Sequence, residues 1–252
     1  MKKLLSIALC ATAVSAFAAS TETVLGRVGV TAITSSLQNT IVAVSYDDLT
    51  GGSGIVVSNF VKTTNLTADD QLAIFNNGTG TEIYDTWILK DEGGVKYWAK
   101  NNKTFYVDAN GQLHAGEGTP ASSITNAVGT GIWLCRAQKP AEPFTFYIYG
   151  KPVSDPVSNI SSNTWTLVGN PTQKTTVKIG PQTPENVGTN AVVAGAQTGD
   201  QIVTVGEGGA LLYFVYVEGS GWTGGLPDIE PGIGFWIRTQ ADTTITWPKD
   251  EE

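Results

Sequence analysis

Histidine and cysteine, the side chains that most often serve as catalytic base and thiol nucleophile, are scarce in this chain. It holds one histidine, His114, and two cysteines, Cys10 and Cys135. A serine or cysteine nucleophile needs a positioned base, most often histidine, and the chain has no Gly-x-Ser-x-Gly motif. The glycine pairs Gly129-x-Gly131 and Gly232-x-Gly234 precede strand-like runs rather than a helix, so they do not predict a dinucleotide site. We therefore expect no catalytic residues and no cofactor-binding residues.

Cys135 follows the apolar run Ile132-Trp133-Leu134. This context is typical of a buried cysteine that packs as a small hydrophobic residue. A nucleophile or an intermolecular bridge are the alternatives, and His114, the one histidine that could activate the thiol, is far away in sequence.

Carboxylates could do two kinds of chemistry. Cleavage of a glycosidic bond needs only two of them, so an extracellular polysaccharide hydrolase stays among the alternatives. Three turn-like clusters, Asp47-Asp48, Asp69-Asp70 and Asp108-x-Asn110-Gly111, carry hard oxygen ligands. None has the full spacing of a calcium loop, and Asp and Asn favour turns by hydrogen bonding their own backbone. We therefore expect no metal site, with a structural calcium ion as the alternative.

Aromatic side chains are the main positive signal, with seven Trp and eight Tyr. Exposed flat rings on a β scaffold can stack on the apolar faces of sugars. Trp98, Tyr97, Tyr106 and Trp222 lie nearest to turns or polar neighbours and are the candidate ligand-stacking residues. The competing interpretation is that they are core or cross-strand aromatics. Trp98 alternates with Lys96 and Lys100, so we expect it on a solvated face, where the segment that follows it either covers it or leaves it as an aromatic platform.

Composition excludes several partners. The formal net charge is −8, and no basic run is present, so the chain is poorly suited to bind nucleic acid or anionic lipid. Charged residues make up only 15% and hydrophobic ones 41%, which argues against disorder. A polysaccharide or a component of the cell envelope is the partner we expect, and homo-association is left open.

The amino terminus has the pattern of an export signal. A positive start at Lys2 and Lys3 precedes an apolar run, and Ala16-Phe17-Ala18 has the small-x-small form of a cleavage site. We expect residues 1–18 to be a signal peptide and the protein to be secreted or extracytoplasmic, in the periplasm, at the cell surface or outside the cell. The apolar run is too short to span a bilayer comfortably, so no membrane span is expected after cleavage.

Short sequence matches predict an internal duplication. Asn39–Val44 resembles Asn163–Val168, Asp70–Ile74 resembles Asp200–Thr204, and Gly129–Leu134 resembles Gly232–Ile237. An aromatic hairpin ending in Trp98 or Trp222 lies between the last two matches in each half. We expect a first β module over residues 19–150, a linker over 151–162 and a second β module over 163–252. Trp133 and Trp236 are expected to be equivalent and mostly buried.

The local pattern predicts an all-β fold, with each module a β-sandwich or a partly closed β-barrel. Short runs rich in Val, Ile, Thr, Tyr and Trp are bounded by Gly, Asn, Asp and Pro, and one helical turn is suggested at Ser58–Val61. Leu211–Val217 is apolar on both faces, as in a strand covered on both sides. An added hairpin is expected in the insertion near 99–121, turning at Asn110-Gly111. The predicted strands cover residues 24–34, 41–46, 71–75, 84–89, 95–99, 131–136, 144–149, 165–168, 191–194, 201–205, 211–217 and 234–238.

Two motifs resemble a known sequence pattern. Trp165-Thr166-Leu167-Val168-Gly169-Asn170-Pro171, followed by Pro231-Gly232-Ile233-Gly234-Phe235-Trp236, is similar to the W-x-L-[VI]-G-N-P … P-G-x-G-F-[WF] repeats of uncharacterised secreted bacterial β-rich proteins. The likeness covers the second copy well and the first only in part, since Val128 replaces the proline. It implies an extracytoplasmic β module, and no catalytic residue is carried over.

Three functions are consistent with these patterns. The first is a secreted or cell-surface non-catalytic β protein with a structural or adhesive role. The second is a glycan-binding module, and the third is the hydrolase mentioned above. Because no catalytic motif is present, we expect the protein not to be an enzyme.

Overall fold

The computed structural model describes residues 29–47, 49, 55–56, 66–75, 84–100, 106–107, 113–114, 125–181, 190–206 and 209–249. These residues form strands and connecting turns, and no α-helix occurs among them, so the predicted all-β class is confirmed. Likewise, none of them belongs to a helix long and apolar enough to cross a bilayer. The expected signal peptide, the helical turn at Ser58–Val61 and the turn at Asn110-Gly111 lie outside the described residues.

The first half of the chain forms short strands where β-branched and aromatic residues cluster between turn residues. The strands are β1 (Gly29–Ser35), β2 (Asn39–Ala43), β3 (Tyr46–Asp47), β4 (Ile55–Val56), β5 (Gln71–Phe75), β6 (Tyr84–Glu92), β7 (Val95–Lys100), β8 (Tyr106–Val107), β9 (Leu113–His114), β10 (Thr125–Asn126), β11 (Gly131–Cys135) and β12 (Phe144–Pro152).

Two main sheets of this half enclose a core. One has the order β2-β11-β5-β6-β7-β8-β9 and the other the order β1-β12-β3, while β4 and β10 form a separate pair. Ile33 of β1 and Ile148 of β12 share a buried cluster with Leu72, Trp87 and other residues of the larger sheet. Strands β8 and β9 pair as the hairpin that the sequence predicted in the insertion, and β8 extends the sheet beyond β7.

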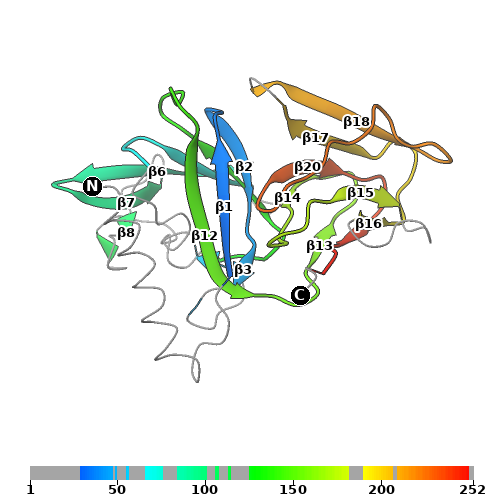
Figure 1. Ribbon diagram of the computed structural model, residues 1–252, viewed down its shortest axis with the longest axis horizontal. Helices are drawn as coiled ribbons and strands as arrows, with labels where there is room; N and C mark the ends of the chain where they lie inside the picture. The colour runs from blue at the N-terminus through cyan, green and yellow to red at the C-terminus, as the bar shows by residue number, and fades with distance from the viewer. Residues whose placement is uncertain are drawn as a thin grey trace.

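The second half repeats the use of two packed sheets (Figure 1). Its sheets have the orders β14-β20-β17-β18-β19 and β13-β21-β16-β15, and Ile160, Ile179 and Ile245 of the second sheet share a buried cluster with Ile202 and Phe235 of the first. The strands are β13 (Val157–Ile160), β14 (Trp165–Gly169), β15 (Lys178–Pro181), β16 (Asn190–Ala194), β17 (Gln201–Val205), β18 (Leu211–Val217), β19 (Gly221–Trp222), β20 (Gly234–Arg238) and β21 (Thr243–Thr246).

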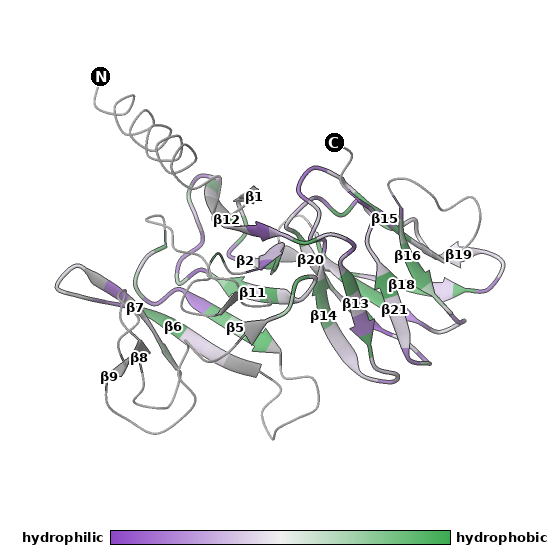
Figure 2. Cartoon of the chain, turned by 90° about the horizontal axis from the view of Figure 1, so that it is seen from below, coloured by the Kyte–Doolittle hydropathy of each residue, from purple (hydrophilic) through white to green (hydrophobic). Residues whose placement is uncertain are grey.

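The two halves meet where β2 and β11 lie beside β14 and β20, as Figure 2 shows. Ala43 N–H donates to the Gly232 carbonyl at 2.7 Å, and Gly169 N–H donates to the Gly129 carbonyl at 2.9 Å. Single β-bridges join Val42 to Ile233 and Thr130 to Val168. We call this region the joint.

Glycine makes this close approach feasible. A Cβ on Gly131 would lie 2.7 Å from Leu167 Cγ and 2.8 Å from the Val168 carbonyl oxygen, and a Cβ on Gly169 would overlap Ala43. Both glycines have ordinary backbone angles, because neither is among those with positive φ. Space, and not backbone conformation, therefore requires glycine at these two positions.

Two sequence expectations need correction. Residues 157–160, expected in a linker, form β13, which pairs with β21, because the buried Ser158 and Ile160 alternate with the exposed Val157 and Asn159 after Pro156. β18, expected to be covered on both sides, exposes Leu211, Leu212, Tyr213 and Val215. The sequence pattern also left out β15 and β21, whose Thr- and Lys-containing runs are short and weakly apolar.

Replacing Gly169 by Ala should destabilise the whole chain by about 3 kcal/mol or more, at the upper end of the cost of overpacking, because backbone as well as side-chain atoms of Ala43 must move. Gly195→Ala is the matched control. Its Cβ would meet nothing within 4 Å, but its φ is +71°, so it should lose only the left-handed strain of about 1–2 kcal/mol. Urea unfolding of both variants tests this, and equal losses would contradict a tight joint.

Candidate functional site

Trp98, one candidate stacking residue, lies in the core of the first half with 6% of its surface exposed. The expectation of a solvated face was wrong, because the neighbouring lysine Lys96 directs its ammonium group to the Leu66 carbonyl at 2.6 Å and leaves its apolar stem over the core. Burial is the outcome expected if Trp98 is covered, and it leaves no ring surface for a ligand.

Trp222, the second candidate, is half-buried against the core of the second half. Its ring meets Tyr216 edge-on, with centroids 5.4 Å apart. The side chains of Tyr97 and Tyr106 lie outside the described part of the structure, although their backbones belong to β7 and β8. Trp98 and Trp222 belong to different sheets, so these two rings form no common platform.

The acidic clusters are used within the fold. The Asp70 carboxylate is buried and accepts hydrogen bonds from Thr67 N–H at 2.9 Å and Ala137 N–H at 2.8 Å. Arg136 Nε lies 2.8 Å from Asp70 Oδ2, and Lys90 pairs with the exposed Asp69. Asp48, Asp108 and Asn110 lie outside the described residues, and no group of three metal-ligating side chains occurs among those that are described.

Asp200 occupies a similar turn in the second half. Its buried carboxylate accepts from Gln197 N–H at 2.9 Å and Gln240 N–H at 2.7 Å. Asp70 therefore connects the turn before β5 to the segment after β11. Asp200 connects the turn before β17 to the segment after β20 in the same way. Their oxygen atoms are engaged by backbone donors, which suits a structural role and not proton transfer.

Cys135 is half-buried, so the sequence overstated its burial. Burial raises the pKa of its thiol to about 11, which keeps the sulfur protonated near neutral pH and opposes a nucleophilic role. His114 lies in β9, and its side chain falls outside the described part of the structure.

An apolar cluster covers one face of the joint. It contains Ile41, Leu167, Val203 and Trp236, with the partly buried Trp133, Trp165 and Val205 packed against it. The rings of Trp133 and Trp236 lie 6.5 Å apart at an angle of 50°. The two tryptophans expected to be core residues thus belong to neither sandwich core but contact each other between the halves, Trp236 buried and Trp133 half-buried.

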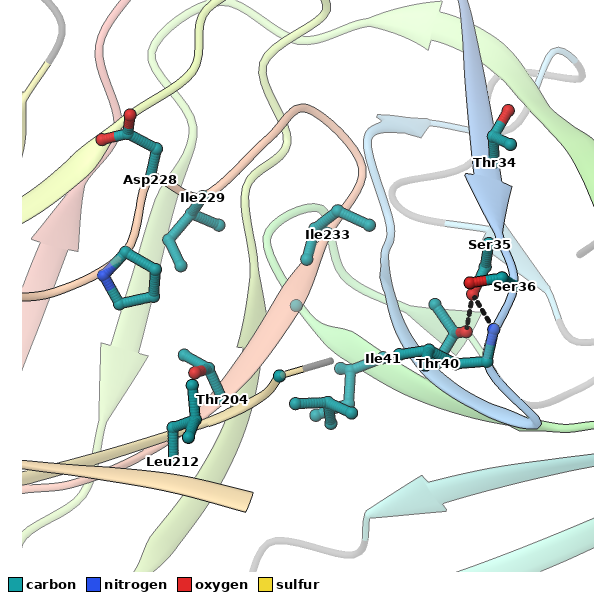
Figure 3. Close-up of a pocket in the computed structure, with 15 residues that line it drawn as sticks. Thr34, Ser35, Ser36, Thr40, Ile41, Thr204, Leu212, Asp228, Ile229 and Ile233 are labelled. Carbon is teal, nitrogen blue, oxygen red and sulfur yellow. Dashed lines mark hydrogen bonds between the residues drawn. The ribbon is translucent and has the colours of Figure 1, made fainter. Parts of the chain in front are cut away.

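A cavity of about 550 Å³ opens beside this cluster (Figure 3). Its first wall is the turn between β1 and β2, with Thr34, Ser35, Ser36 and Thr40. Its second wall comes from β17, β18 and the segment before β20, with Thr204, Leu212 and Asp228. Such a volume falls within the usual range of small-molecule sites, which often form between domains.

β18 presents a second candidate surface. Leu211, Tyr213 and Val215 share one face of the strand and are 46%, 66% and 36% exposed. Isolated exposed apolar residues are common, but contiguous ones mark an interaction surface.

Sequence analysis missed both surfaces for different reasons. The cavity is built from residues about 170 positions apart in sequence, and no local pattern could join them. The apolar run of β18 was recognised, yet its pattern is the same in a covered strand and in an exposed one.

No family model, curated protein or solved structure matches this chain. Function therefore has to be argued from the two surfaces themselves.

Asp70→Asn should destabilise the protein more than Asp200→Asn. Either change weakens charge-assisted hydrogen bonds to backbone N–H groups, at a cost of about 1–3 kcal/mol. Asp70→Asn also removes the carboxylate beside the largely buried Arg136, which raises the expected loss to about 3–5 kcal/mol. Denaturant titration measures both values, and a greater loss for Asp200→Asn would contradict this assignment.

The Cys135 thiol of the folded protein should react with iodoacetamide about a hundredfold more slowly at pH 8 than the same thiol in urea. A pKa near 11, against an ordinary value of 9.0, reduces the thiolate fraction by that factor. The rate should rise as the pH approaches 11, and Cys135→Ser identifies the signal by mass spectrometry. A fast reaction of the folded protein at pH 8 would show a reactive cysteine.

Proposed function

We propose that this protein is a secreted or cell-surface non-catalytic β protein with a structural or adhesive role, and that copies associate through β18. The observation that carries the proposal is the apolar outer edge of β18 from Leu211 to Tyr213, with which no described strand pairs. The export signal expected at residues 1–18 and the low charge content support it.

The backbone hydrogen bonds of β18 show which edge is open. Tyr216 N–H donates to the Asp200 carbonyl, so the polar backbone groups of Tyr216 face the side of β17. Those of Val215 face the other way and bond Thr223. Because this direction alternates along a strand, the N–H and C=O groups of Leu211 and Tyr213 also point outward, beyond the two-residue strand β19, where no described strand pairs with them.

A second copy of the chain suits this edge. In an antiparallel pair related by a two-fold axis through Leu212, Leu211 of each copy lies opposite Tyr213 of the other and the two exchange main-chain hydrogen bonds. Leu211–Val217 contains no charged residue, so the pairing meets no like-charge repulsion within the strand. Strand addition of this kind is a common mode of protein recognition, and proteins that stay monomeric usually block such edges.

We also propose that the halves are two copies of one module. The order β2-β11-β5-β6-β7 matches β14-β20-β17-β18-β19, and the pair β1-β12 matches β13-β21. Leu89 N–H donates to the Asp70 carbonyl as Tyr216 N–H donates to that of Asp200. A two-fold axis that relates Ala43 to Gly169 then also relates the contacts of the joint. The hydrogen bond from Ala43 to Gly232 corresponds to the one from Gly169 to Gly129, and the bridge between Val42 and Ile233 corresponds to the one between Val168 and Thr130.

The register of these pairs revises one sequence match. Trp133 pairs with Ile41, and Trp236 pairs with Leu167, so Ile41 corresponds to Leu167 and not to Trp165. A shift of two residues preserves the inward and outward alternation of a strand, which is why the sequences also match in the wrong register.

The two proposed copies differ in the strand that follows β6 or β18. In the first half, β7 pairs with β6 from Trp87 to Glu92, and β8 and β9 extend the sheet further. In the second half, the corresponding strand β19 has two residues. The partner strand is therefore longer in the first half, although Tyr84 and Thr86, the counterparts of Leu211 and Tyr213, lie outside its pairing.

A glycan-binding module is the second candidate function. Trp98 no longer supports it, because its ring is buried, but the cavity lined with hydroxyl groups does. The polysaccharide hydrolase is less favoured, because the two buried carboxylates, Asp70 and Asp200, are held by backbone donors.

Tyr213→Lys should weaken self-association at least tenfold, because it places a charge next to the proposed two-fold axis, opposite the apolar Leu211 of the other copy. Tyr149→Lys is the matched control, since Tyr149 is also an exposed tyrosine, 40% accessible, on β12 of the first half. Sedimentation velocity over a range of concentrations measures both. The proposal fails if the unaltered protein stays monomeric throughout, or if both substitutions weaken association equally.

A further inference from the structure

The two walls of the cavity offer hydroxyl groups on opposite sides. On the first wall, Ser35 Oγ lies 2.7 Å from Thr40 Oγ1 and accepts from Leu37 N–H at 3.0 Å (Figure 3). These bonds fix the turn between β1 and β2, so its hydroxyl groups are held in place without a ligand. The neighbouring Ser36 is exposed at the mouth of the cavity.

Thr204 supplies the hydroxyl of the second wall. The residue is 6% exposed, and its Oγ1 atom is buried without a hydrogen-bond partner among the described residues. A buried hydroxyl without a partner is uncommon and costs stability. A ligand hydroxyl that entered the cavity could provide this partner after a rotation about χ1.

Most of the remaining lining is apolar. Ile41, Leu212, Ile229 and Ile233 contribute aliphatic side chains to the cavity. This combination fits a ligand with polar groups at its rim and C–H groups on its faces.

The charges in the described lining favour a neutral ligand over an anionic one. Among the described lining residues, Asp228 alone has an ionisable side chain. Its carboxylate lies 3.6 Å from the Nζ atom of Lys178, a residue that is not part of the lining. No lysine or arginine is part of the described lining, so a phosphate, sulfate or carboxylate group would meet no cation there.

We propose that this cavity binds a neutral carbohydrate, with Thr40 and Thr204 hydrogen bonding sugar hydroxyls and Ile233 and Leu212 packing against the C–H faces of the ring. The site rests on the second candidate function above and gives it a location between the halves, away from the aromatics that the sequence suggested. Because the walls come from both halves, the site exists only when the joint is formed.

The test uses the neutral disaccharides maltose, cellobiose and N,N′-diacetylchitobiose, with a uronic acid disaccharide as the anionic comparison. Binding is measured by isothermal titration and by saturation-transfer NMR at about 10 mM sugar, which nearly saturates a site with a Kd of ~1 mM. At least one neutral disaccharide should bind, and the anionic one should bind at least tenfold more weakly.

Two cavity variants locate the site. Ser36→Trp fills the mouth from an exposed position and should abolish binding, while Thr204→Val should weaken it about threefold to tenfold, the value of one neutral hydrogen bond. Thr246→Val, on the exposed face of β21, is the control and should bind as the unaltered protein does.

Three results would overturn the inference: no neutral disaccharide binds, the anionic sugar binds best, or Ser36→Trp binds sugar normally. Sedimentation of Ser36→Trp separates this site from the association surface. If sugar binding is lost while self-association through β18 persists, the two activities are independent, and a failure of either leaves the other standing.

Discussion

The close approach of two strand pairs at the joint is the constraint on which the arrangement of this protein depends. Main-chain hydrogen bonds from Ala43 to Gly232 and from Gly169 to Gly129 cross it, and they can form only because glycine at positions 131 and 169 leaves no Cβ in the way. Each half has its own core, so the joint does not create the sandwiches. It fixes how they face each other.

Several features follow from that geometry. The apolar faces of the two larger sheets come together, and Trp133 and Trp236 contact each other instead of lying in the separate cores. The turn between β1 and β2 is brought opposite β17 and β18, which encloses the hydroxyl-lined cavity.

The sequence predicted the strands well where alternation and turn residues agreed. Gln71–Phe75, Gln201–Val205, Leu211–Val217 and Gly234–Arg238 were each predicted with the bounds that the structure has. Prediction was weaker where the same local sequence pattern is compatible with either a buried or an exposed side chain in the folded protein. Lys96 and Lys100 suggested a wet face around Trp98, yet Lys96 spans the rim of the core and reaches a carbonyl.

The candidate surfaces were less accessible to sequence analysis. Pairing between distant segments determines whether an apolar strand such as β18 is covered, and a cavity formed by two halves has no signature in either half. Asp70 and Asp200 did match in sequence, but the matching roles of their carboxylates became visible only with the hydrogen bonds to Ala137 and Gln240.

The central claim is that the joint makes the two halves one structural unit. Differential scanning calorimetry tests this claim most directly. If the joint couples the halves, the described β structure should melt in one transition whose calorimetric enthalpy equals the van't Hoff enthalpy. A calorimetric enthalpy of about twice the van't Hoff value, or two resolved transitions, would mean that the sandwiches unfold independently. That result would contradict the account, because a cavity shared by the halves requires them to stay together.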